Sequence, residues 1–150
     1  MAAKMPRPGG DSTKTALTHV ENTLDPIIFP DSRVLLLGSM PSPKSREIGF
    51  YFGNPQNRFW RVVAALYGEK PLKSIPEKID FCKRHHLALC DVLKACDIKG
   101  ASDASIANPI PHNIGALIQD SSICAIFTLG GTATKFYKRY TEQQTGISAR

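Results

Sequence analysis

A loop of aromatic, amide and basic side chains is the part of the sequence best suited to bind a ligand. Residues 49–60 read GFYFGNPQNRFW, with three consecutive aromatics between two glycines. A polar loop of this kind cannot send all three rings into a core, so at least one should line a pocket. Aromatic faces stack on nucleobases at roughly 1–3 kcal/mol each, and Lys44 and Arg46 could hold phosphate. The alternative is a loop whose rings pack only on one another.

Two glycine-containing turns could hold an anion. The segment from Gly38 to Ser45 nearly matches the phosphate loop G-x-x-x-x-G-K-[ST], but Pro43 replaces its second glycine. Proline has no N–H and fixes φ at about −65°, so the amide nest that cradles phosphate is lost. We therefore reject a phosphate-loop triphosphatase. Gly130-Gly131 could accept an anion at the start of a helix or could simply form a turn, and both interpretations stay open.

The residues that commonly hold metals or form covalent intermediates are not arranged for either purpose. No two of the four cysteines form a CxxC pair, and His85-His86 has no carboxylate or cysteine at ligand spacing. We expect reduced, mostly buried thiols and no metal. No G-x-S-x-G turn or Ser-His-Asp order is present, so a covalent hydrolase is not supported. His112, in a predicted loop, could touch a nucleic acid.

Length, composition and charge favour one globular domain with a polyanionic partner. The chain has 150 residues, 42% of them hydrophobic, and a net charge of +6. We expect a disordered tail over residues 1–18 and a single domain over residues 19–150. A basic body attracts polyanions such as nucleic acid. The absence of a long apolar run or a secretory signal predicts a cytoplasmic protein without a membrane partner, and the oligomeric state stays open.

Alternating apolar runs and helical stripes predict an α/β fold with a parallel sheet and helices on both faces. Ligands of such sheets bind beyond the carboxyl ends of the strands. The sequence predicts three strands, and a fourth would be expected where the chain stops at Arg150. A sheet of three strands would leave one edge bare. The predicted strands are 34–37, 87–93 and 124–129, the helices are 57–68, one opening at Ser74, 114–119 and 131–140, and the loops are 39–56 and 94–113.

The segments GSMPSPKSREIGFYFGNPQNRFW, ALCDVLKACDIKGASDASI and IFTLGGTATKFYKRY, with the preceding VLLL, resemble the uracil-DNA glycosylase superfamily. The resemblance runs from about residue 30 to 145 and is closest to the hypoxanthine-DNA (deoxyinosine) glycosylase group. It implies a three-layer α/β/α sandwich and a monofunctional DNA repair enzyme. The implied reaction is excision of a deaminated base, hypoxanthine or also uracil, from DNA, with no metal or organic cofactor.

The resemblance also implies roles for individual residues. Met40 stands where a mismatch-specific branch has Asn or Asp, and a thioether cannot orient water. Catalysis would then fall on Asn57, with Asn54 as second choice, although either asparagine could instead cap the following helix. Asp91, at a strand end, could assist the leaving base or cap a loop. The remaining implied residues are Phe52, Ser39, Met40 and Tyr51 for the base, and Ser42, Lys44, Ser45, Arg46 and His112 for DNA.

One expected element of the superfamily is a second motif that enters the minor groove. It should follow about where Arg150 ends the sequence. A domain without it could bind damaged DNA without cutting it, so a non-catalytic DNA-binding module of the same fold is the alternative to an enzyme. A small-nucleotide hydrolase using the same sheet edge is a third and weaker possibility.

Overall fold

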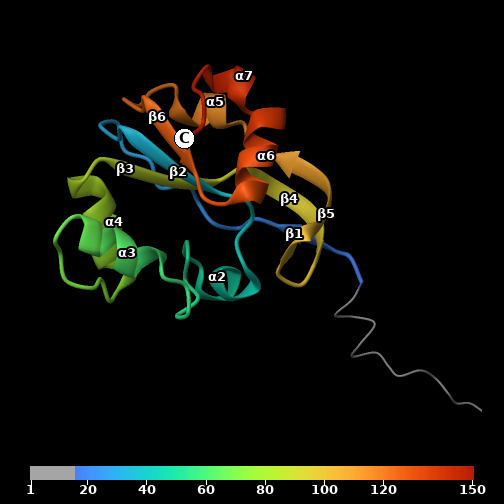
Figure 1. The fold of residues 1–150 in the computed structure, drawn as a ribbon, viewed down its shortest axis with the longest axis horizontal. Helices are drawn as coiled ribbons and strands as arrows, with labels where there is room; N and C mark the ends of the chain where they lie inside the picture. Colours follow the sequence, from blue (N-terminus) through green and yellow to red (C-terminus); the bar gives the residue numbers. More distant parts are fainter. Residues whose placement is uncertain (1–15) are drawn as a thin grey trace, which may run out of the picture.

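The computed structural model describes residues 16–150, and in it two sheets lie between two groups of helices (Figure 1). Most of the predicted tail, residues 1–18, falls outside the described residues, and β1 begins at Thr18. The elements in chain order are β1 (Thr18–Glu21), β2 (Val34–Gly38), α2 (Pro43–Ile48), α3 (Phe59–Leu66), α4 (Ile75–Arg84), β3 (Leu87–Asp91), β4 (Leu93–Lys99), β5 (Ser102–Pro111), α5 (Ile114–Ile118), β6 (Ala125–Thr128), α6 (Gly131–Tyr140) and α7 (Glu142–Thr145).

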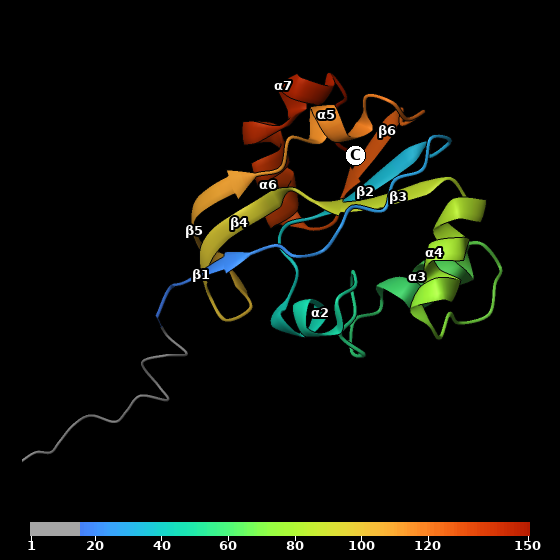
Figure 2. The same cartoon turned by 180° about the vertical axis from the view of Figure 1, so that it is seen from behind.

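The first sheet is parallel, with strand order β3-β2-β6, as the apolar runs predicted. Leu35 and Leu37 of β2 are fully buried, which is typical of a central parallel strand covered on both faces. Helices α5, α6 and α7 lie on one side of the sheets, and α2, α3 and α4 lie on the other (Figures 1 and 2). The predicted α/β/α arrangement around a parallel sheet is therefore confirmed.

The second sheet is antiparallel, with strand order β1-β4-β5, and it corrects the prediction of a loop over residues 94–113. Buried and exposed residues largely alternate along β4, the period-2 pattern of a strand. The partner strand β5 is rich in the short polar residues Ser, Asp and Asn, which made the hairpin look like a loop in the sequence. Gly100, with φ of 55°, makes the turn into β5. The single strand expected over residues 87–93 is likewise two strands that meet at Val92.

The parallel sheet has three strands, as expected, and a single bridge pair lies at each of its edges, so neither edge is entirely bare. On the β3 side, Ile27 and Leu89 exchange two backbone hydrogen bonds of 2.9 Å each. On the β6 side, Ala149 pairs in parallel with Ile126, and the Arg150 N–H donates to the Ile126 carbonyl at 2.9 Å. No helix among residues 16–150 is both long and apolar enough to cross a membrane.

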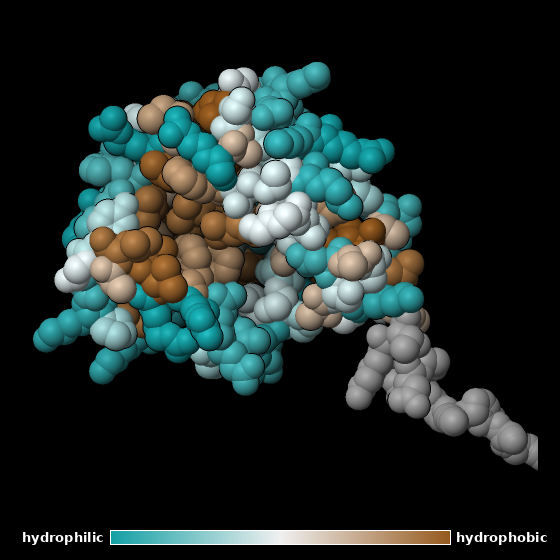
Figure 3. All heavy atoms as spheres, viewed as in Figure 1, coloured by the Kyte–Doolittle hydropathy of each residue, from teal (hydrophilic) through white to brown (hydrophobic). Residues whose placement is uncertain are grey.

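Helix α3 buries only part of the face that its sequence predicted. The helical spacing of its apolar residues predicted a core stripe of Phe59, Val62, Val63 and Leu66; Phe59 and Val63 pack on the core, but Val62 and Leu66 are 50% and 76% exposed. The buried residues are Trp60 and Ala64, since the Trp60 indole N–H donates to the Tyr51 carbonyl at 2.9 Å and draws that face inward. Figure 3 shows apolar surface in a hollow on the side of the molecule where α3 and β6 lie. Apolar surface of this kind is typical of contact regions.

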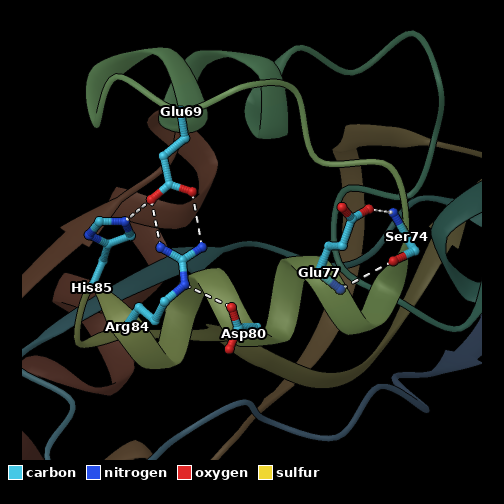
Figure 4. A network of polar contacts seen from close by, with 6 residues as sticks. All are labelled: Glu69, Ser74, Glu77, Asp80, Arg84 and His85. Atoms are coloured by element: carbon cyan, nitrogen blue, oxygen red, sulfur yellow. Dashed lines mark hydrogen bonds and ion pairs between the residues drawn. The ribbon is translucent and has the colours of Figure 1, made fainter.

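Helix α4 begins with a capping box and ends in a cluster of charges (Figure 4). The Ser74 hydroxyl accepts from the Glu77 N–H, and the Glu77 carboxylate accepts from the Ser74 N–H, as the sequence predicted for a helix opening there. At the other end, the Arg84 guanidinium donates two hydrogen bonds to Glu69, at 2.7 and 2.9 Å. The cluster ties the segment after α3 to the last turn of α4.

This cluster should make stability depend on pH. Hydrogen bonds from Arg84 and His85 lower the pKa of Glu69 from its ordinary 4.5 to about 2. A lowered carboxyl pKa contributes stability that is present above about pH 4.5 and is lost as the pH falls toward 2. We expect Glu69→Gln to lower the Tm at pH 7 and to match wild type near pH 2. Thermal melts across that range test this, with exposed Glu47→Gln as the control; an equal deficit at both pH values would contradict it.

Candidate active site

A cavity of about 240 Å³ opens where β2 and β3 end, at the edge where ligands of parallel sheets bind. It is smaller than the pockets of roughly 300–1,000 Å³ that take drug-sized molecules, so it suits a single base. The lining residues come from the end of β2 and the turn into α2, the aromatic loop, the end of β3, the β4–β5 hairpin and the residue after β6. They are Gly38, Ser39, Met40, Pro41, Ser42, Ser45, Phe52, Asn57, Asp91, Ile98, Ala101, Asp103 and Leu129.

The inner wall of the cavity is formed by Gly38 and Asp91, which are paired across β2 and β3. Asp91 is only 3% exposed. A Cβ added at Gly38 would lie 2.6 Å from Oδ1 of Asp91 and 3.9 Å from the Phe52 ring. Oδ1 therefore occupies the space that a side chain at position 38 would need, and only glycine allows the carboxyl group to lie there.

Substitution of Gly38 tests this close approach. In Gly38→Ala the new methyl group would force the Asp91 carboxyl group to move, and we expect a loss of about 1–3 kcal/mol in the free energy of unfolding. Urea unfolding measures the change. The matched control is Gly131→Ala, whose added Cβ meets no atom within 4 Å. Equal stability of the two variants would show that Asp91 can move freely.

Burial dominates the ionisation of Asp91. It raises the pKa of this carboxyl group from 3.8 to about 7, against a lowering hydrogen bond from Asn22 and with a smaller raising effect of the Asp103 charge. The Asn22 amide donates to Oδ2 at 3.0 Å. Near neutral pH, Asp91 is therefore present partly as the acid, which can donate a hydrogen bond, and partly as the carboxylate, which can only accept.

A second carboxylate reaches the cavity from the β4–β5 hairpin. The Ser39 hydroxyl donates to Oδ2 of Asp103 at 2.7 Å, which joins the end of β2 to the start of β5. Ile98 and Ala101 of the same hairpin also line the cavity. The second sheet thus supplies one wall of the site and a fixed negative charge.

The aromatic wall is Phe52, which has an unusual backbone conformation. Its φ is 53°, in the left-handed region that bulky residues rarely adopt. The ring stacks on Phe59, with centroids 4.0 Å apart and planes 28° apart. The Ser45 hydroxyl accepts from the Gly53 N–H at 3.0 Å and so secures the turn. Strain of this kind persists only where the surroundings fix it, and here it places a flat ring beside Asp91.

Asn57 also lines the cavity, and it does so from an exposed position at the start of α3. Its Oδ1 accepts from the Phe59 N–H at 2.8 Å, which forms a turn just before α3; the N-cap of the helix is Arg58, so the capping role considered for Asn57 from the sequence is not observed. An amide oxygen has two lone pairs. One lone pair of the Asn57 oxygen therefore remains to accept from water, while the hydrogen bond from the Phe59 N–H holds the side chain in place.

The sequence profile of the uracil DNA glycosylase superfamily matches residues 26–148, which is most of the chain. The chain belongs to the uracil DNA glycosylase superfamily. The fold agrees, since the solution NMR structure of a candidate uracil DNA glycosylase from Methanosarcina acetivorans matches with a TM-score of 0.75. That match has 26% identity and covers 89% of this chain and 82% of the other.

Curated relatives of this superfamily member are hypoxanthine DNA glycosylases from two archaea. The protein from Methanosarcina barkeri is 36% identical over 83 residues, which cover 54% of this chain and 52% of the relative. The protein from Methanosarcina acetivorans is 35% identical over 83 residues, with 55% and 52% coverage. The matched part thus spans about half the length of these curated relatives.

The residues that the superfamily resemblance suggested fall into two groups. Those that line the cavity are Ser39, Met40, Ser42, Ser45, Phe52 and Asn57. Five others do not line it. Tyr51 is buried and its hydroxyl donates to the Asp25 carbonyl, Asn54 Oδ1 accepts from the Gln56 N–H, and Lys44 pairs with Glu47 on the surface. Arg46 and His112 are partly buried outside the cavity.

For Tyr51 this placement corrects the interpretation of the sequence. Its side chain is 2% exposed and packs edge-on against Phe50, 6.0 Å between centroids, so the ring belongs to the core and has no face free for a base. Of the three consecutive aromatics, only Phe52 reaches the cavity, because its left-handed φ turns it away from the direction of its neighbours.

Sequence reasoning missed Asp103 and Asn22 as site residues. Asp103 lay in a segment predicted to be a loop, and Asn22 contacts Asp91 across 69 positions of sequence. The one available signal was Asp91 itself, an acid that directly follows four apolar residues of a buried strand. A buried acid needs a partner, but its identity depends on the tertiary fold.

Proposed function

We propose that this chain acts as a DNA glycosylase that hydrolyses the N-glycosidic bond of a deaminated base, hypoxanthine first and uracil second. The observation that carries the proposal is one cavity, sized for a single base, in which Phe52, Asn57 and Asp91 meet. The family membership supports the glycosylase class. Relatives named hypoxanthine DNA glycosylase support the choice of base.

In the proposed complex the target nucleotide leaves the helix and its base enters the cavity. Enzymes that react with a base in duplex DNA extrude it and stack it on an aromatic or apolar side chain, a task for Phe52. Ser42 at the mouth, with Lys44 and Arg46 nearby on α2, holds the DNA backbone through its phosphates. The net charge of +6 supports binding to DNA.

The reaction needs a placed water and a stabilised leaving group. Water adds to C1′ of the sugar as the C1′–N bond breaks, and the bonding electron pair leaves with the base. The water gives up one proton, the base gains one, and the products are an abasic sugar and a free base. Asn57 Oδ1 accepts from the water and places it; an amide is a poor base, so its contribution is positioning. Acidic Asp91 donates to the carbonyl oxygen on which charge develops.

The proposal is tested with a labelled duplex that carries one hypoxanthine. Protein is incubated with the duplex, and hot alkali then breaks the strand at any abasic site. We expect scission at the hypoxanthine, weaker scission of a uracil duplex, and none in the matched duplex with adenine. Retention of the duplex in a gel shift without scission would instead favour the non-catalytic DNA-binding module.

A further inference from the structure

Asn22, directly after β1, makes a set of hydrogen bonds that fixes its side chain completely. Both hydrogens of Nδ2 are used, one donated to Oδ2 of Asp91 and one to the Leu93 carbonyl, each at 3.0 Å. Its Oδ1 accepts from the Leu24 N–H at 3.0 Å. The backbone N–H of Asn22 donates to the Lys94 carbonyl at 2.8 Å. Asn22 precedes the segment that matches the superfamily, residues 26–148.

Only one orientation of this amide is compatible with its partners. If Oδ1 and Nδ2 exchanged places, the amide oxygen would face the Leu93 carbonyl oxygen, and Nδ2 would face the Leu24 N–H. Both contacts would be repulsive, because acceptor would meet acceptor and donor would meet donor. Nδ2 is therefore the group that faces Asp91, and Oδ2 of Asp91 must be an acceptor.

This requirement decides which oxygen of Asp91 can carry a proton. In a carboxylic acid the carbonyl-type oxygen is a stronger acceptor than the hydroxyl oxygen, so a proton on Oδ2 would weaken the buried hydrogen bond from Asn22, whereas a proton on Oδ1 preserves it. Oδ1 is the oxygen that lies 2.6 Å from the Cβ position of Gly38, and Gly38 lines the cavity. The acid form of Asp91 thus has its O–H on the cavity side.

We propose that Asn22 is a positioning residue that keeps Oδ2 of Asp91 as an acceptor and so directs the acid proton onto Oδ1, which donates it to a carbonyl oxygen of the bound base. The inference rests on the proposed function and specifies the substrate class. Hypoxanthine and uracil present a carbonyl oxygen where adenine and cytosine carry an amino group. An O–H donor would pair with the first group and oppose the second, so hypoxanthine is distinguished from adenine and uracil from cytosine.

The charges around Asp91 are compatible with this arrangement. The titratable groups that face it are Asp103 of β5, Tyr51 of the aromatic loop and Cys90, its neighbour on β3. Burial raises the pKa of Tyr51 and that of Cys90 above their usual values, so both are neutral at working pH. Asp103 supplies negative charge, which favours the acid form of Asp91.

The test compares Asn22→Ala and Asn22→Asp with Thr23→Ala, an exposed neighbour outside the site. Single-turnover excision of hypoxanthine is measured from pH 5 to 9. We expect Asn22→Ala to lower the maximal rate about tenfold and to move the alkaline loss of activity to higher pH, because a hydrogen bond that lowers the pKa of Asp91 is gone. Asn22→Asp keeps the shape but places an acceptor against Oδ2, which draws the proton away from the cavity, so its rate should fall further.

A second readout does not depend on activity. Carbon-13 NMR titration of the Asp91 carboxyl group should give a higher pKa in both Asn22 variants than in wild type and Thr23→Ala. Rates and pH profiles equal to those of Thr23→Ala, or an unchanged Asp91 titration, would overturn the inference. If wild type excises no base, the proposed function fails alone, and the titration still decides whether Asn22 controls the Asp91 proton.

Discussion

The Asn57→Ala variant should excise hypoxanthine about 100-fold or more slowly than wild type. The loss follows from the geometry, since misplacement of a reacting water by about 1 Å can cost about 100-fold in rate. Asn57 lines the cavity, and the Phe59 N–H holds its amide oxygen at 2.8 Å. Single-turnover cleavage of the hypoxanthine duplex measures the effect.

Asn57 also accepts a hydrogen bond from the first residue of α3, so the controls must separate stability from chemistry. Loss of such a hydrogen bond costs about 1 kcal/mol, and the Ser hydroxyl can accept in a similar turn. Asn57→Ser should therefore keep the Tm of wild type but stay nearly as slow as Asn57→Ala. Asn54→Ala removes a neighbouring amide that does not line the cavity and should stay within about threefold of wild type. If Asn57→Ala also stayed within threefold, the role assigned to Asn57 would be wrong.

Exchange of Asp91 for Asn should abolish the loss of activity above neutral pH. In wild type the donor on Oδ1 disappears as the pH rises through about 7, the pKa to which burial raises this group. In Asp91→Asn the Asn22 amide still requires an acceptor, so the new carbonyl oxygen takes the place of Oδ2 and the new amide N–H faces the cavity at every pH. Asp91→Ala has no donor at any pH and should be about 100-fold or more slower than wild type at acidic pH, with a deficit that shrinks as the pH rises above about 7 and wild type loses its own donor.

The same exchange should change stability with a defined sign. A carboxyl pKa raised above its ordinary 3.8 contributes stability below that value, and this stability is lost as the pH rises through about 7. Asp91→Asn carries no charge and avoids the loss. Its Tm relative to wild type should therefore increase between pH 4 and 8, as measured by thermal melts. The activity profile gives the contradicting outcome. If excision by Asp91→Asn fell at alkaline pH as excision by wild type does, Asp91 would not be the group whose titration causes the fall.

The sequence predicted the parts of the site that lie on strong local patterns. The runs around Leu35 and Leu89 predicted buried parallel strands, and their ends correctly located the cavity. The aromatic loop correctly suggested that one ring would reach a pocket. It could not specify which ring, because a left-handed φ at Phe52 is set by tertiary contacts and not by residue type.

The parts that could not be predicted depend on pairing between distant segments. The β5 strand of the hairpin is rich in short polar residues and pairs with β4 in an irregular register, so its sequence does not read as a strand. Asp103 reaches the cavity, and Asn22 reaches Asp91, only because this hairpin pairs with β1. The helical stripe of α3 failed for a related reason: Val62 and Trp60 are both apolar, and the contact with Tyr51 decides which of them is buried.

A crystal structure of the Asn57→Ala variant bound to a duplex with one hypoxanthine would test the central claim most directly, because the slow variant preserves the intact substrate. The account predicts an extruded hypoxanthine stacked on the Phe52 ring, with its carbonyl oxygen within hydrogen-bond distance of Oδ1 of Asp91. A complex in which the hypoxanthine stays stacked in the duplex, or lies against another surface while this cavity holds only water, would contradict it.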